Sequence, residues 1–142
     1  MKIETDEYGN KFWKNKSGEF HRLDGAAIEY ANGSKCWYIN GKHHRTDGPA
    51  VEYRDGSKEW YLDGKCHRLD GPAIDDADGY KSWFVNGKLH RKDGPAIEWA
   101  NGNKEWYIDG IALTEEEFDN WVRNNGTDWN EELKTLFDLT FK

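Results

Sequence analysis

The chain of 142 residues carries a formal net charge of −7, so its length fits one domain and its acidity argues against a generic basic nucleic-acid binder. Hydrophobic residues make up only 36%, below the ~45–50% of ordinary globular chains, which argues against a thick, two-layered core. Aromatic residues reach 15%, a share that excludes an intrinsically disordered chain.

A period of 23 residues organises residues 1–112. A degenerate half-repeat over 9–20, which contains Trp13 and one extra residue between Lys14 and Ser17, precedes four copies. Each copy opens with the motif His-Arg-x-Asp-Gly, and the copies start at 21, 44, 67 and 90. A fixed period of this length is the signature of a repeat architecture.

Each copy contains two turn signals. The first is Asn32-Gly33, Asp55-Gly56, Asp78-Gly79 and Asn101-Gly102, and the second is Asn40-Gly41, Asp63-Gly64, Asn86-Gly87 and Asp109-Gly110. Such dipeptides supply the positive φ angles of a type I′ hairpin turn, and short runs of β-type composition separate them. The sequence therefore predicts a mainly β fold, an elongated single-layer antiparallel meander of β-hairpin repeats over residues 1–112.

The turn length sets the register of the predicted hairpins. A two-residue turn at Asp55-Gly56 places Val51 opposite Trp60, which predicts a ladder of tryptophan and branched aliphatic side chains on one face. The same count places Glu52 opposite Glu59, and like charges in that position are unfavourable. A one-residue bulge that shifts the register is therefore one expectation.

Residues 113–142 differ from the repeats, with eight acidic and three basic residues and a net charge of −5. The segment Thr114-Glu115-Glu116-Glu117 is a capping-box sequence that opens a helix. Phe118, Trp121 and Val122 follow at helical spacing, and Gly126 is a stop signal. We expect a short C-terminal α-helical cap on the last repeat, because repeat arrays need capped ends.

A second short helix is predicted after Asp128 to Glu131, carrying Leu133, Leu136 and Phe137. The alternative to a cap is an acidic helix that binds a partner and competes with nucleic acid for a basic groove. A net charge of −5 over this segment is modest for a mimic of DNA, so we favour the cap.

The repeats resemble the MORN family, which also has a period of 23 residues. The Gly-Lys turn of that family is matched at Asn40-Gly41-Lys42, Asp63-Gly64-Lys65 and Asn86-Gly87-Lys88. The chain has His-Arg-x-Asp-Gly-Pro-Ala where the family usually shows a His-Gly-x-Gly-like stretch. That variant, with a last repeat that runs into Leu113 to Phe118, resembles repeat proteins common in bacteriophage genomes. The resemblance implies β-hairpin repeats that serve mainly as interaction scaffolds.

The His-Arg pairs are one candidate binding set, a cationic ladder for phosphates or acidic side chains. Its members are His21, Arg22, His44, Arg45, His67, Arg68, His90 and Arg91. The planar guanidinium suits both kinds of ligand, and successive copies would lie about 9–10 Å apart. A structural role is the favoured interpretation, because Asp47 lies two residues after Arg45 and can pair with it, and His44 falls opposite Trp37.

The second candidate set is aromatic. Its members are Trp37, Trp60, Trp83, Trp106, Tyr38, Tyr61, Phe84 and Tyr107. One sheet cannot bury both of its faces, and the C-terminal helices are too short to cover the array. Exposed aromatic surface is typical of interaction sites, so we expect these side chains to bind a partner.

No metal site, cofactor or catalytic centre is expected. Equivalent histidines ~10 Å apart cannot share one zinc ion, whose ligands lie ~2.1 Å from the metal. Neither Cys36 nor Cys66 has a second cysteine nearby in the sequence, and the neighbours Cys66 and His67 would face apart in a strand. The glycines are spaced as turn residues and form no phosphate-binding loop.

We therefore expect a non-enzymatic protein-binding module. The bacteriophage resemblance implies an accessory protein that inhibits a host defence or host enzyme in the host cytoplasm, and the first ten residues lack an apolar secretory segment. Two alternatives stay open: a binder of small anions or nucleotides that uses the His-Arg ladder, and a structural scaffold or homodimer paired through exposed edge strands. Direct nucleic-acid or membrane-surface binding is not expected, given the net acidity.

Overall fold

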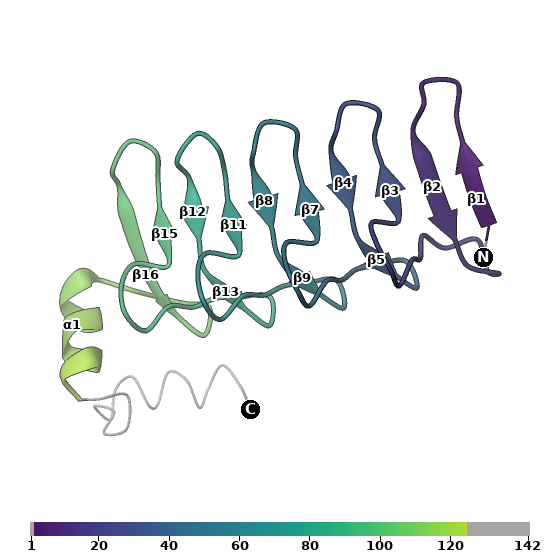
Figure 1. Ribbon diagram of the computed structural model, residues 1–142. Helices are drawn as coiled ribbons and strands as arrows, with labels where there is room; N and C mark the ends of the chain where they lie inside the picture. The colour runs from purple at the N-terminus through teal and green to yellow at the C-terminus, as the bar shows by residue number, and fades with distance from the viewer. Residues whose placement is uncertain (1, 125–142) are drawn as a thin grey trace.

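The computed structural model describes residues 2–124, which form a long row of β-hairpins with one helix at its end (Figure 1). Eleven strands make one antiparallel sheet, and this confirms the predicted mainly β, elongated meander. The strands across the sheet are β1 (Lys2–Thr5), β2 (Lys11–Lys14), β3 (Ile28–Glu29), β4 (Lys35–Cys36), β7 (Val51–Glu52), β8 (Lys58–Glu59), β11 (Ile74–Asp75), β12 (Lys81–Ser82), β15 (Ile97–Glu98), β16 (Lys104–Ile108) and β17 (Ile111–Leu113).

A second row of short hairpins lies below the sheet (Figure 1). These hairpins are β5 (Tyr38–Ile39) with β6 (Lys42–His43), β9 (Tyr61–Leu62) with β10 (Lys65–Cys66), and β13 (Phe84–Val85) with β14 (Lys88–Leu89). Neighbouring hairpins are joined by backbone bonds; the N–H of Gly64, for example, donates to the carbonyl of His43 at 2.8 Å. Each of the first three copies thus adds one hairpin to each row, and in the fourth copy β16 pairs with both β15 and β17.

The repeated tryptophan connects the two rows. Trp37 is the single residue between β4 and β5. Its N–H donates to the carbonyl of Ala50 at 2.7 Å, and its carbonyl accepts from the N–H of His44 at 3.1 Å. Equivalent bonds form at Trp60 and Trp83, so the backbone of each tryptophan pairs in both rows.

The first turn of each copy differs from the prediction. In the hairpin of β7 and β8, the N–H of Tyr53 donates to the carbonyl of Ser57 at 2.9 Å, which leaves a three-residue loop. Gly56 has a φ of 94° and supplies the left-handed residue that such a loop needs. The predicted pairing of Val51 with Trp60 is therefore wrong, because the extra loop residue places Val51 opposite Glu59.

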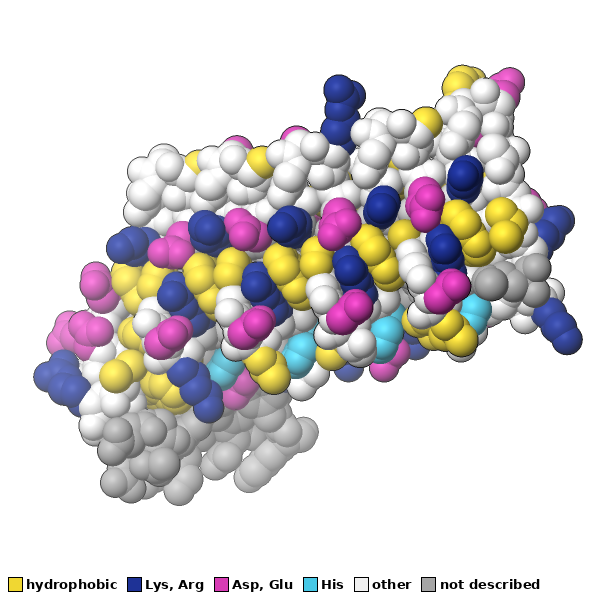
Figure 2. Space-filling model, in the orientation of Figure 1, with side chains coloured by type: hydrophobic (Ala, Val, Ile, Leu, Met, Phe, Trp, Pro, Cys, Tyr) yellow, Lys and Arg dark blue, Asp and Glu magenta, His cyan; other side chains and the backbone are white. Residues whose placement is uncertain are grey.

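This shifted register is the one that the charges favour. Glu52 pairs with Lys58 rather than with Glu59, and the same alternation continues across the sheet. The row consists of Lys11, Glu29, Lys35, Glu52, Lys58, Asp75, Lys81, Glu98 and Lys104. Figure 2 shows basic and acidic side chains alternating along this face. The bulge predicted from like-charge repulsion is confirmed.

The second turn of each copy is the predicted type I′ turn. Asn40 and Gly41 have φ angles of 48° and 79°, and the three equivalent pairs have closely similar values. The half-repeat differs, because the N–H of Asn15 donates to the carbonyl of Glu19 at 2.9 Å around a three-residue loop. That loop accommodates the extra residue noted between Lys14 and Ser17.

The helix α1 (Glu115–Arg123) closes the array, as predicted. Thr114 and Glu117 form the expected capping box, with the Glu117 N–H donating to the Thr114 hydroxyl at 3.1 Å. Phe118 and Trp121 are buried against Ile108 and Leu113 of the last hairpin. The helix ends at Arg123, ahead of Gly126; the predicted second helix and that glycine lie outside the described residues.

Candidate functional site

The arginine of each His-Arg-x-Asp-Gly loop is held by its own loop. The Nε of Arg45 donates to Asp47 at 2.9 Å, and its Nη1 donates to the Pro49 carbonyl at 3.0 Å and lies 3.3 Å from a Glu52 oxygen. The guanidinium carbon lies 3.8 Å from the centre of the Trp37 ring, a cation–π contact. The Trp37 ring thus packs on Arg45, whereas the sequence placed His44 opposite Trp37.

The arrangement recurs in every copy. Arg22, Arg68 and Arg91 lie over Trp13, Trp60 and Trp83 at 4.0, 3.8 and 3.8 Å. We call the sheet face that carries these arginines and tryptophans the arginine face. Each of these arginines donates to the aspartate two residues on and to a carbonyl four residues on.

The arginine face therefore neutralises its own charge. The four arginine side chains are only 19–23% exposed. Hydrogen bonds from Arg45 and Arg68 hold the pKa values of Asp47 and Asp70 below their usual range, which keeps both carboxylates ionised. These contacts engage the Nε and Nη1 atoms of each arginine of the predicted cationic ladder within its own loop.

The histidines of the motif connect consecutive copies. Nδ1 of His44 accepts the N–H of Asp63, 19 residues later, at 3.1 Å, and His21, His67 and His90 make the equivalent bond at 2.9–3.0 Å. Because Nδ1 is the acceptor, it carries no proton in this arrangement. The four histidines thus stabilise the next type I′ turn along the array.

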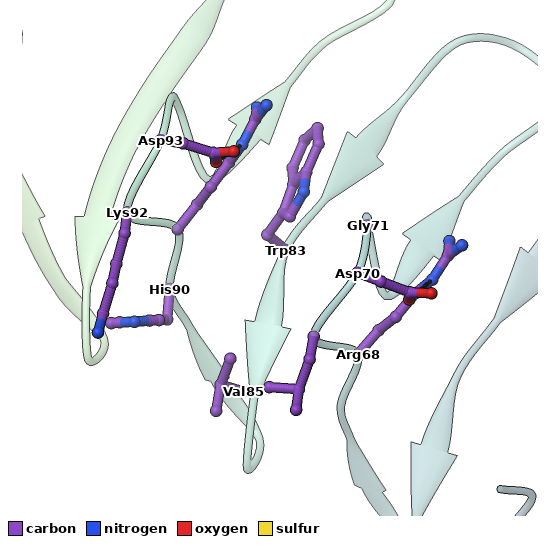
Figure 3. Close-up of a pocket in the computed structure, with 10 residues that line it drawn as sticks. Arg68, Asp70, Gly71, Trp83, Val85, His90, Lys92 and Asp93 are labelled. Carbon is purple, nitrogen blue, oxygen red and sulfur yellow. Dashed lines mark hydrogen bonds and ion pairs between the residues drawn. The ribbon is translucent and has the colours of Figure 1, made fainter.

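Three equivalent hollows lie between consecutive loops of the arginine face. Their volumes are about 420, 520 and 710 Å³, in chain order. In the largest, Figure 3 shows Trp83 and Val85 between the loop of Arg68 and Asp70 and the loop of Lys92 and Asp93. Leu69, in the loop of Arg68 and Asp70, is 81% exposed. In each of the two smaller hollows two arginines face two aspartates, whereas the largest has Arg68, Arg91 and Lys92 against Asp70 and Asp93.

The predicted aromatic set is divided by the structure. Trp37, Trp60 and Trp83 lie on the arginine face under guanidinium groups, and Trp106 packs against the cluster formed with α1. Tyr38 and Tyr61 pack instead against the buried residues Ile28, Cys36 and Val51. Phe84 and Tyr107 are half-buried.

A chain of ring contacts runs along this second group. The centroid distances are 6.0 Å for Phe12 and Phe20, 5.4 Å for Phe20 and Tyr38, 4.2 Å for Tyr38 and His43, and 5.0 Å for His43 and Tyr61. Because successive strand residues point to opposite faces, Glu59 lies on the face opposite to Lys58. We call the face that carries Glu59 and these rings the tyrosine face.

The tyrosine face has a hollow of about 350 Å³, here called the Glu59 hollow. Its lining residues are Tyr30, Asn32, Ser34, Cys36, Tyr38, His43, Val51, Tyr53 and Glu59. Glu59 accepts from the hydroxyl of Tyr53 at 3.1 Å and from that of Tyr61 at 2.9 Å. Tyr30 and Tyr53 remain 39% and 43% exposed, so their rings are accessible to a partner.

Glu59 is not among the site residues predicted from the sequence. The sequence did contain a signal for this residue. Glu59 is the acidic equivalent, in the second copy, of Cys36 and Ser82, and the row across the sheet that contains it otherwise holds Ile28, Val51 and similar residues. Using that signal requires the register, which the turn prediction misplaced by one residue. Glu105 repeats the pattern, accepting from Nε1 of Trp99 at 2.6 Å and from the Tyr107 hydroxyl at 3.4 Å.

The two cysteines are free thiols. Burial, with a smaller contribution from the Glu59 charge, raises the pKa of Cys36 to about 11 and that of Cys66 to about 12. Both therefore stay protonated near neutral pH and are weak nucleophiles. Among residues 2–124, no three His, Cys, Asp or Glu side chains come together in a way that could hold a metal ion.

Two half-buried histidines, His43 and His90, should make the stability of the folded chain depend on pH. Burial lowers the pKa of His43 and of His90 below 6.5, so the unfolded chain binds more protons than the folded chain as the pH falls below that value. Stability contributed by the neutral rings is complete above pH 6.5 and is lost progressively below it. We expect the urea midpoint to fall between pH 7 and pH 5.

The variant His43→Phe tests this attribution, because phenylalanine occupies the equivalent place in the half-repeat, as Phe20. Its urea midpoint should change less with pH than that of the wild type. An equal or steeper change in the variant would show that His43 is not a source of the effect.

No helix in the described part of the chain is long and apolar enough to cross a membrane.

Comparison with known proteins adds no relative: no protein-family model matches the chain, and no curated protein matches it.

Proposed function

We propose that the chain is a non-enzymatic module that binds another protein through its tyrosine face. The observation that carries this proposal is the row of exposed rings at one position of the repeat. Tyr30, Tyr53 and Trp99 take that position in the first, second and fourth copies and are 39%, 43% and 44% exposed. Tyrosine and tryptophan are enriched among the residues that dominate binding energy at protein interfaces.

The arginine face supports the same choice by contrast. Its guanidinium groups are paired with carboxylates and stacked on tryptophans, so binding an anion there would require breaking existing contacts. This disfavours the alternative in which the His-Arg ladder sequesters a small anion or nucleotide. The scaffold alternative rests on pairing of exposed strands between copies of the chain.

The biological setting is part of the proposal and rests on the sequence resemblance alone. The His-Arg-x-Asp-Gly-Pro-Ala repeats and the segment from Leu113 to Phe118 are similar to those of bacteriophage repeat proteins of the MORN type. We propose on that basis an accessory protein that acts in the cytoplasm of a host cell by binding and inhibiting a host defence protein or enzyme.

Native mass spectrometry of the tagged chain, recovered gently from host cells, tests the proposed function. We expect a stoichiometric added mass of protein size, lost when Tyr53 and Trp99 are both replaced by serine. An added mass of a few hundred daltons would instead favour the small-ligand alternative. A homodimer as the sole assembly would favour the scaffold.

A further inference from the structure

We infer that the Glu59 hollow binds the cationic head of a lysine or arginine side chain presented by a partner protein. The inference rests on the proposed function and names the chemistry of its recognition site. Three features of the hollow carry it: a carboxylate without a cationic partner, accessible aromatic rings around it, and a size that fits one side chain.

The carboxylate of Glu59 has no ion-pair partner among residues 2–124. Its two hydrogen bonds come from the neutral hydroxyls of Tyr53 and Tyr61, one to each oxygen. An ionised carboxylate offers about four lone-pair sites, so about two remain for another donor. Glu52, which lies opposite Lys58 on the arginine face, contrasts with Glu59 by pairing with Arg45.

The charge of Glu59 is felt by its neighbours. Burial, followed by this charge, raises the pKa of Tyr53 to about 12. Burial, followed by the hydrogen bond to Glu59 and then by its charge, raises the pKa of Tyr61. His43 is the titratable base in the hollow, and burial lowers its pKa despite the opposing effect of Glu59. His43 is therefore neutral near pH 7 and does not compensate the carboxylate.

The rings around Glu59 favour an organic cation. Tyr30, Tyr38 and Tyr53 all line the hollow, and the faces of such rings attract ammonium and guanidinium groups. A divalent metal ion is a poor fit, because calcium takes six to eight oxygen ligands and a single carboxylate is available here. A basic side chain satisfies the carboxylate and the rings together.

The size of the hollow indicates a single side chain. Its volume of about 350 Å³ lies near the lower end of the range of ~300–1,000 Å³ for small-molecule sites. Tyr30 and Tyr53 are partly exposed, so the head of a side chain can reach Glu59 without unfolding of the sheet.

Isothermal titration calorimetry on the full chain tests the inference. The probes are the capped pentapeptide Gly-Ser-Lys-Ser-Gly and its counterparts with arginine or norleucine at the central position. We expect binding of the lysine or the arginine peptide at low salt, and at least about ten-fold weaker binding of the norleucine peptide, because a charge-assisted hydrogen bond is lost.

Two variants locate the site. Glu59→Gln retains the shape of the side chain and should weaken the binding of the basic peptide about ten-fold or more. Glu7→Gln makes the same change in net charge at an exposed turn and should leave the affinity within about two-fold. Matching thermal unfolding curves of wild type and Glu59→Gln would show that the fold is intact.

The outcomes separate this inference from the proposed function. Equal affinity of the norleucine and lysine peptides, or equal weakening by Glu59→Gln and Glu7→Gln, would overturn the cation site. Should a protein-size mass still be present in the native mass spectrum, the binding function would stand and only its basis at Glu59 would be rejected. Absence of that mass, with peptide binding at Glu59, would leave the cation site and reject the protein partner.

Discussion

Replacing Phe118 by alanine should lower the free energy of unfolding by about 3–5 kcal/mol, the usual cost of truncating a buried aromatic ring. Phe118 is 5% exposed and packs with Ile108, Leu113 and Trp121 at the junction of the last hairpin and α1. Each repeat in such an array contacts only its neighbours, so the loss should act first on the end of the array. Urea unfolding followed by tryptophan fluorescence measures the change.

Val122→Ala is the matched control, because Val122 lies on the same helix but is 44% exposed. It should change the free energy of unfolding by at most about 0.5 kcal/mol. Amide hydrogen exchange should show the loss of protection in Phe118→Ala concentrated in β16 and β17. Equal losses in the two variants would mean that the helix does not seal the array.

Replacing Gly71 by alanine should destabilise the chain by about 2 kcal/mol, although the glycine is only half-buried. A Cβ atom at this position would lie 2.8 Å from Cζ and 3.0 Å from Nη1 of Arg68. Arg68 cannot move aside without loss, since it donates to Asp70 at 2.9 Å and to the Pro72 carbonyl at 3.0 Å and lies over Trp60. Urea unfolding again gives the measurement.

A double-mutant cycle isolates this contact from other effects of the added methyl group. In an Arg68→Ala background, Gly71→Ala should cost less than about half of its effect in the wild type, because the displaced group is already absent. Leu69→Ala in the same loop, at a side chain that is 81% exposed, should cost little. Additive costs for Gly71 and Arg68 would contradict the steric explanation.

The fold was predictable because every copy repeats the same local signals. Asn40-Gly41 dictates a type I′ turn through its two positive φ angles, and Thr114 with Glu117 dictates the start of the helix. The first turn was mispredicted because Asp55-Gly56 suits both a two-residue and a three-residue loop. The cross-strand charges, with Glu52 opposite Lys58, select the longer loop.

The sites were harder to predict because they depend on contacts between copies and rows. The period shows an arginine and a tryptophan in each copy, but not that Arg45 covers Trp37. The Glu59 hollow depends on a register shift of one residue. It also depends on Tyr53 and Tyr61, whose hydroxyls both donate to the Glu59 carboxylate. The sequence placed these residues in separate patterns, so their meeting was visible only in the structure.

The most direct test of the functional account is a two-dimensional NMR titration of the full chain with the capped pentapeptide Gly-Ser-Lys-Ser-Gly. The account predicts chemical-shift changes on the tyrosine face, centred on Tyr30, His43, Tyr53 and Glu59. Changes centred instead on the loops of the arginine face, around Arg68 and its equivalents, would contradict it, since those groups would then be the ones that meet the ligand.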